Sequence, residues 1–199
     1  MANKVFNMAG GLHSAAAYSA FEDAIYGSCV ANDSSFVATA GTGMNVLLSS
    51  GDGLISTGTG FARRIEADAT NTVPVTSASS ANPRIDAIVA YIDMSVTPTV
   101  NVVDNTNDIL KFKAVAGTPA ASPSEPSAAT IQSSVGAGNP YMVLWYLTVP
   151  TGATSVAVGT FTDVRRVATT GVRLILSTED IGEGADLADN TLYGVYQED

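Results

Sequence analysis

Residues 142–147 read Met142-Val143-Leu144-Trp145-Tyr146-Leu147, a run in which every side chain is apolar or aromatic. Successive side chains of a β-strand point to opposite faces of a sheet, so a strand without polar positions has both faces buried. The run predicts a central strand over 142–149 that is covered on both sides, with the N-terminal helix described below on one of them.

Short apolar or alternating runs, separated by Gly, Asn, Asp and Pro, flank this strand in the sequence. They are typical of strands joined by turns. In 110–114 apolar residues alternate with Lys111 and Lys113, which predicts one buried and one solvated face. The glycines of 41–43 and 51–53 are interpreted as turn residues rather than phosphate-binding loops. The predicted strands are 36–40, 45–48, 60–65, 72–76, 85–92, 99–103, 110–115, 142–149, 155–158 and 161–164.

Residues 15–26 lack Gly and Pro, and their large apolar side chains fall three to four positions apart. The spacing predicts a short amphipathic helix with Ser14 as its N-cap and Gly27 after its end, packed on a sheet. The expected fold class is therefore mainly β, an antiparallel β-sandwich with one short N-terminal α-helix and a small C-terminal β extension.

Composition divides the chain into three predicted parts: an N-terminal arm over 1–13, a β-sandwich attachment domain over 14–167, and an acidic C-terminal β-hairpin extension over 168–199. The formal net charge of the 199 residues is -10. Seven acidic residues follow Arg173 and no basic residue does, which leaves 12 acidic and 9 basic residues before them. Such a chain is repelled by phosphate backbones, so nucleic-acid binding is not expected.

Charged residues make up only 14% of the chain and hydrophobic residues 46%, which argues against disorder and for a packed core. The longest strongly apolar run, 141–149, is about half the length that spans a bilayer, and the N-terminus does not resemble a secretory signal. No membrane partner is therefore expected.

Side chains that usually serve in catalysis and metal binding are scarce. Cys29 and His13 are the single cysteine and the single histidine, and no neighbouring residue activates the thiol. Asp86 and Asp93 lie too far apart along one predicted strand for a glycosidase pair. The acidic residues of 179–189 lack EF-hand spacing, so a solvated acidic loop is preferred over a weak calcium site. We expect no catalytic residue, no metal, no cofactor and no enzymatic activity.

Residues 117–126 contain the prolines Pro119, Pro123 and Pro126, so this segment cannot pair as a central strand. It is expected to be an extended loop. Two interpretations stay open for it, a surface or oligomer contact arm, here called a candidate assembly loop, and a simple crossover between strands.

Several segments resemble a known family when they are taken in order. The chain is similar to the N-terminal domain of baseplate upper proteins of tailed bacteriophages and of related tail-fibre or minor structural proteins. The resemblance covers residues 14–166, and this chain is shorter than the family's usual members. The segments that carry it are Tyr18-Ser19-Ala20-Phe21, Gly43 to Ile55, Asn82-Pro83-Arg84-Ile85-Asp86-Ala87-Ile88-Val89, Ala116 to Pro123 with Pro126, Leu147 to Ser155, and Thr162-Asp163-Val164-Arg165-Arg166.

The resemblance implies a virion structural protein, commonly homotrimeric, that docks onto the baseplate or tail tip through protein-protein contacts. It implies the virion as the location, the tail or baseplate before the capsid, after synthesis in the host cytoplasm. Two alternatives remain: a capsid head-fibre or decoration protein, and a module that recognises host-surface carbohydrate. In the second, Tyr91, Tyr141 or Tyr193 would stack on a host glycan.

Charged residues near the ends of two predicted strands form a candidate structural ion-pair cluster. Arg84 and Asp86 lie on the same side of their strand and are expected to pair with residues of the last strand. The partners are Asp163 and Arg165 or Arg166. Ordinary surface pairing, with about 0–1 kcal/mol of stabilisation, and bidentate contacts between protomers are the alternatives.

Overall fold

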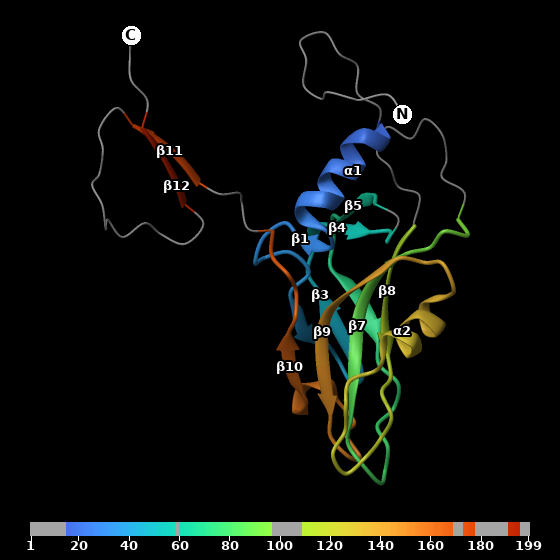
Figure 1. Cartoon of the computed structure of the whole chain (residues 1–199). Coiled ribbons are helices and arrows are strands. Elements are labelled where there is room, and N and C mark those ends of the chain that lie inside the picture. Colours follow the sequence, from blue (N-terminus) through green and yellow to red (C-terminus); the bar gives the residue numbers. More distant parts are fainter. Residues whose placement is uncertain (1–14, 59, 97–108, 169–172, 178–190, 196–199) are drawn as a thin grey trace, which may run out of the picture. The chain divides into compact units, whose positions relative to one another are not determined.

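The computed structural model describes residues 15–58, 60–96, 109–168, 173–177 and 191–195. They are mainly β, with three antiparallel sheets and few helices (Figure 1). The chain divides into two compact units, Met1–Val167 and Ala168–Asp199. Among the described residues no helix is long and apolar enough to cross a membrane.

The described elements of the larger unit follow one another in this order. They are α1 (Ala15–Tyr26), β1 (Cys29–Val30), β2 (Ala38–Ala40), β3 (Asn45–Leu48), β4 (Gly51–Ser56), β5 (Ala62–Ala67), β6 (Asn71–Pro74), β7 (Arg84–Ile92), β8 (Leu110–Val115), α2 (Ala128–Val135), β9 (Tyr141–Val149), the 3-10 helix η1 (Val156–Val158) and β10 (Thr160–Asp163). The sheets are ordered β10-β9-β7-β8, β2-β3-β6 and β1-β4-β5.

Strand β9 lies in the interior of the four-stranded sheet, between β10 and β7, so the prediction of a central strand is confirmed. The register places Val143 opposite Val89 but Trp145 opposite Ile88, which makes Leu144 the extra residue of a β-bulge. The bulge changes which positions of β9 face inward: Met142 and the bulge residue Leu144 are buried, and beyond the bulge the buried positions are Leu147 and Val149.

One hydrophobic cluster joins all three sheets. Along β7 the side chains of Ile88, Ala90 and Ile92 point into it. Because side chains alternate along a strand, Ala87 and Val89 point to the other face of the same sheet. Other buried members of the cluster are Val30, Phe36, Val46, Leu48, Ile55, Ile65, Val73, Met142, Leu144 and Leu147.

The helix on that other face is α2, not the N-terminal helix, which corrects the expectation from sequence. Ile131 and Val135, one turn apart on α2, are buried against the strand residues Ala87 and Val89. Helix α1 instead lies beside β4 and β5 (Figure 1). The four-stranded sheet is thus covered on both faces where its apolar run lies.

Local signals for α2 are present in the sequence, although α2 is not among the predicted elements. The Ser127 side chain accepts a hydrogen bond from the Thr130 backbone N–H at 3.2 Å and caps the helix. Gly136 ends it with a φ of 104°, a conformation that favours glycine. The helix has only eight residues and few large apolar side chains, so its periodicity is weak.

Two local predictions are wrong. In the strand predicted at 155–158, residues Val156–Val158 form η1, and the Ser155 hydroxyl caps it by accepting a hydrogen bond from the Ala157 N–H. Gly51 and Gly53, predicted in a turn, lie within β4. Gly53 is required there by close approach, since a Cβ would lie 2.6 Å from the Cys29 carbonyl oxygen. Gly43, with a φ of 64°, does lie in the turn between β2 and β3.

The second unit contains β11 (Arg173–Ser177) and β12 (Thr191–Val195), which pair in parallel. The predicted C-terminal hairpin needs antiparallel strands and is therefore wrong for these residues. The predicted strand at 99–103 and the arm over 1–13 lie outside the described residues.

Candidate functional site

A buried ion pair lies at the start of β7. The Arg84 Nε donates to Asp86 Oδ1 at 2.8 Å, and Nη2 donates to Asp86 Oδ2 at 3.0 Å. The Arg84 and Asp86 side chains are 4% and 0% exposed. Two residues apart on a strand, both point to one face, where the planar guanidinium matches the carboxylate in a bidentate contact.

The same arginine also holds the segment that follows β6. Its Nη1 donates to the Ser77 carbonyl at 2.8 Å, and Nη2 donates to the Thr76 carbonyl. Lysine has no fork of donors that reaches a carboxylate and two carbonyls at once. Arg84 therefore fixes the path of the β6–β7 connection as well as the position of the Asp86 carboxylate.

The carboxylate of Asp86 reaches the start of the candidate assembly loop. Its Oδ1 accepts a hydrogen bond from the Gly117 N–H at 3.0 Å. Gly117 packs so closely on β7 that a Cβ would lie 2.1 Å from the Ile85 carbonyl oxygen. Three residues later the Ala120 N–H donates to the Pro83 carbonyl at 3.0 Å. The loop is therefore hydrogen-bonded to both sides of Arg84.

The three prolines of this loop differ in exposure. Pro119 is exposed, Pro123 is half-buried and Pro126 is buried directly before α2. The loop lies at the lower end of the view in Figure 1, beside the connections that leave β6 and β9. The Gly152 N–H donates to the Ser79 carbonyl at 2.8 Å and joins those two connections. The structure thus brings three loops together at the end of the sheet where Arg84 and Asp86 lie, and two of them bind the pair directly.

A second ion pair closes the end of β10. The Arg165 Nε and Nη2 donate to the two carboxylate oxygens of Asp163, at 2.9 and 2.6 Å. The guanidinium carbon lies 4.7 Å from the ring centre of Trp145, a cation-π geometry. The Arg165 Nη1 also donates to the carbonyls of Asp33 and Ser35. Arg165 therefore ties β10 to the loop before β2.

That loop contains a strained residue, Phe36, which is fully buried and has a φ of 56°. A bulky side chain rarely adopts this conformation, so its surroundings must stabilise it. The Trp145 indole N–H donates to the Phe36 carbonyl at 2.9 Å, and the Phe36 ring packs on Phe112 with centroids 5.6 Å apart. The Arg165 contacts with the carbonyls of Asp33 and Ser35, which precede Phe36, complete this support.

The hydrogen bond from Arg165 lowers the pKa of Asp163 below its ordinary value, against the opposing effect of partial burial.

In the neighbouring segment the Arg166 Nη1 donates to the Tyr26 carbonyl at 2.6 Å, at the end of α1. Burial raises the pKa of the Cys29 thiol, and the charge of Arg166 offsets this in part. A buried thiol with a raised pKa is not an activated nucleophile. His13 lies outside the described residues.

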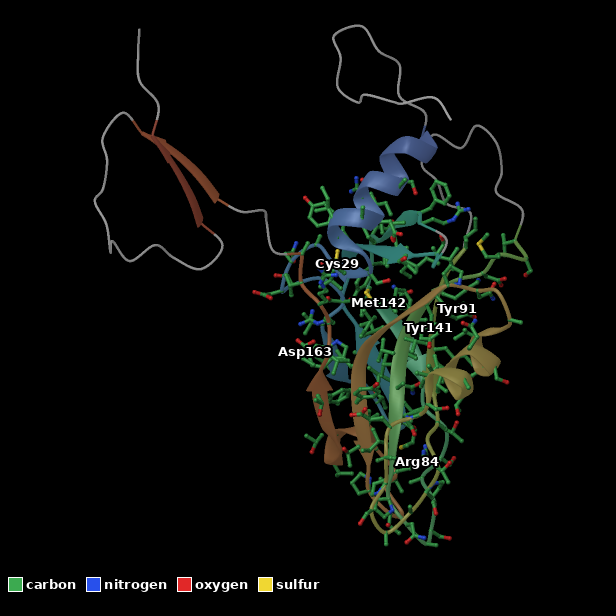
Figure 2. The ribbon with its side chains drawn as sticks, in the orientation of Figure 1. Cys29, Arg84, Tyr91, Tyr141, Met142 and Asp163 are labelled. Carbon is green, nitrogen blue, oxygen red and sulfur yellow. The ribbon has the colours of Figure 1, made fainter. Side chains whose placement is uncertain are left out.

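The five residues of the predicted ion-pair cluster do not form one cluster. In the sheet register Asp163 is level with Trp145 and Ile88, whereas Arg84 is level with Val149. Four strand residues separate these levels, a distance of about 13 Å. Figure 2 shows Arg84 and Asp163 well apart. Each arginine pairs with the aspartate two positions away on its own strand end, because that partner shares its face.

The remaining candidates lie elsewhere. Tyr91 and Tyr141 are directly opposite each other on β7 and β9 and are half-buried beside α2 (Figure 2). The Tyr141 hydroxyl donates to the Ala128 carbonyl at 3.3 Å. Nothing is described of the Tyr193 side chain. Among the described residues there is no group of three or more His, Cys, Asp or Glu that could hold a metal ion, and 179–189 lie outside them.

No protein-family model, no curated protein and no solved structure matches this chain. The features with the densest set of polar contacts are the two arginine-centred sites, and both hold loops in place.

Replacing Asp86 by alanine should lower the free energy of unfolding by about 3–5 kcal/mol, because it leaves the buried Arg84 charge without its partner. Urea denaturation of the purified chain measures this. The matched control is Asp52→Ala, which breaks an exposed pair with Arg64 and should cost less than about 1 kcal/mol. Equal losses in the two variants would contradict the structural role of the Arg84–Asp86 pair.

The pair at β10 predicts a pH dependence. Because the pKa of Asp163 is lower in the folded than in the unfolded chain, its contribution to stability is complete above the unfolded value of about 3.9. It is lost as the pH falls through the folded pKa. The difference in stability between the native chain and Asp163→Asn should therefore be constant above about pH 5 and shrink below pH 4. Melting curves at several pH values test this, and a constant difference down to pH 2 contradicts it.

Proposed function

We propose that this chain is a structural protein of a bacteriophage virion, a trimeric attachment or adaptor module of the baseplate or tail fibre. It acts by binding other proteins and catalyses no reaction. The family resemblance of the sequence supports this proposal, and so does the way the resembling segments meet in space.

The observation that carries the proposal is a contact between two of those segments. Asp86, from Pro83-Arg84-Ile85-Asp86, accepts the hydrogen bond of Gly117, from Gly117-Thr118-Pro119. Pro83 accepts the hydrogen bond of Ala120 in the same loop. These two segments of the resemblance are therefore bonded to each other. Together they hold a proline-rich loop rigid on the end of a sheet.

A rigid exposed loop suits a contact with another protein. Ordering a loop on binding costs free energy, and a loop that is already held in place avoids most of that cost. The exposed residues of this loop are small or uncharged, with the exception of Glu125. Interface centres are depleted of charged side chains, so the composition of the loop fits such a contact.

We also propose that the larger unit is a β-sandwich. The hydrophobic cluster joins β7 and β9 of one sheet with β2, β3 and β6 of another, as expected for two sheets packed face to face. In such a fold the loops gather at the two ends, where they are free to contact partners.

Immunogold electron microscopy of purified virions, with an antibody against this chain, tests the proposed function. We expect label at the tail tip or baseplate. Label over the head would replace the proposal by a capsid head-fibre or decoration protein. Absence of label from both intact and disrupted particles would overturn a virion role.

The assembly loop can be tested by a surface charge. Ala121→Lys places a lysine on an exposed position of the loop, and it should leave the melting temperature unchanged but reduce incorporation into particles at least tenfold. The control is Ala69→Lys, an exposed position in the turn between β5 and β6. Quantitative mass spectrometry of purified particles compares them. Normal incorporation of Ala121→Lys would remove the loop from the interface and leave it as a crossover.

A further inference from the structure

We propose that the free edge of β10 binds an extended, uncharged or basic segment of a different protein of the particle, which adds to the sheet as a further strand. This inference rests on the proposed function and names a second contact for it, separate from the assembly loop. An extended backbone is the ligand that a strand edge recognises, because its N–H and C=O groups match those of the edge.

β10 is one of the edge strands of the described sheets, which also include β1, β2, β5, β6 and β8. In the described part of the chain, β10 pairs with one strand, β9, and ends the four-stranded sheet. The edge strand at the other side, β8, lies against β6 and β5 of the other sheets. The edge strand β1 is bridged at Val30 to Val167. The body is therefore closed along β8 and open along β10.

Natural proteins protect open edges with charged side chains, and β10 lacks that protection. The edge strand β5 carries exposed Arg63, Arg64 and Glu66. The charge on β10 belongs to Asp163, which turns toward Arg165 and is neutralised by it. The ion pair at the end of β10 therefore removes the charge that would otherwise repel an added strand.

The outward side chains of β10 form an uncharged row. Phe161 packs against the hydrophobic cluster, and its neighbours Thr160 and Thr162 are exposed. At the two ends of the row lie Val158, 64% exposed, and Val164, 40% exposed. β-branched residues favour pairing with other β-branched or aromatic side chains across strands. A segment with such residues at alternate positions would cover both valines.

Length and charge identify the source of the segment. β10 has four residues, too few to bury the roughly 1,200–2,000 Å² that a stable contact between two folded copies requires. An extended segment needs less, because it brings its own backbone to the edge. The chain carries a net charge of -10, so a neutral or basic segment is favoured over an acidic one.

Hydrogen exchange with mass spectrometry, on the purified chain and on assembled particles, tests the proposal. The outward amides of residues 160–164 should exchange at least tenfold more slowly in particles than in the purified chain. Amides of β6, an edge already covered by β8, should exchange equally in both samples. Equal exchange of 160–164 in both samples overturns the proposal. Slow exchange already in the purified chain, increasing with concentration, assigns the edge to a second copy and overturns it as well.

A pair of variants separates this contact from the folding of the chain. Thr162→Lys adds an outward charge to β10, and it should leave the melting temperature unchanged and reduce incorporation into particles at least tenfold. Thr72→Lys makes the same change at an exposed position of β6 and should be incorporated normally. If the native chain is absent from particles, the proposed function fails and this inference with it. If the native chain is present and Thr162→Lys is incorporated equally well, the inference alone fails.

Discussion

The bidentate contact between Arg84 and Asp86 is the interaction on which one end of the body depends. Both side chains are removed from water, which costs several kcal/mol per ion unless every polar atom is satisfied. Here five hydrogen bonds satisfy them, two within the pair and three to the backbone of neighbouring loops. Such a pair adds little net stability over apolar residues, but it favours the observed loop positions, because these place the loop backbone within hydrogen-bond distance of the buried charges.

The Arg165–Asp163 pair has the same arrangement, but only its arginine is covered. Asp163 is partly exposed, while Arg165 is almost fully covered by Trp145 and by the loop that contains Phe36. In both pairs an aspartate two residues away fixes the arginine, and the arginine's remaining donors bind carbonyls of a loop. The strain at Phe36 persists because Trp145 and Arg165 bind the carbonyls around it. Short polar motifs on the strands thus determine the conformation of loops distant in sequence.

The sequence predicts the strands well where one physical rule dominates. Alternation located 110–115 and a run of apolar residues located the central strand, both of which the structure contains. Prediction from the sequence fails where the close approach of two backbones or the register of strand pairing determines the local structure. Gly53 resembles a turn residue but serves a close contact with Cys29, and the bulge at Leu144 leaves no mark in composition. The ion pairs show the same limit. The sequence identifies the charged residues, but which of them pair depends on the register, and the register places the two pairs at different levels of the sheet.

The two arginine sites also lower the charge of the surfaces beside them. Arg84 and Arg165 are covered, and each neutralises an aspartate. The surfaces beside them, the proline-containing loop and the outer row of β10, therefore consist mainly of small and β-branched residues on a rigid support. Rigidity lowers the entropy cost of association, and the absence of charge lowers its desolvation cost. A chain with a net charge of -10 needs such neutral surfaces wherever it is to approach another protein closely.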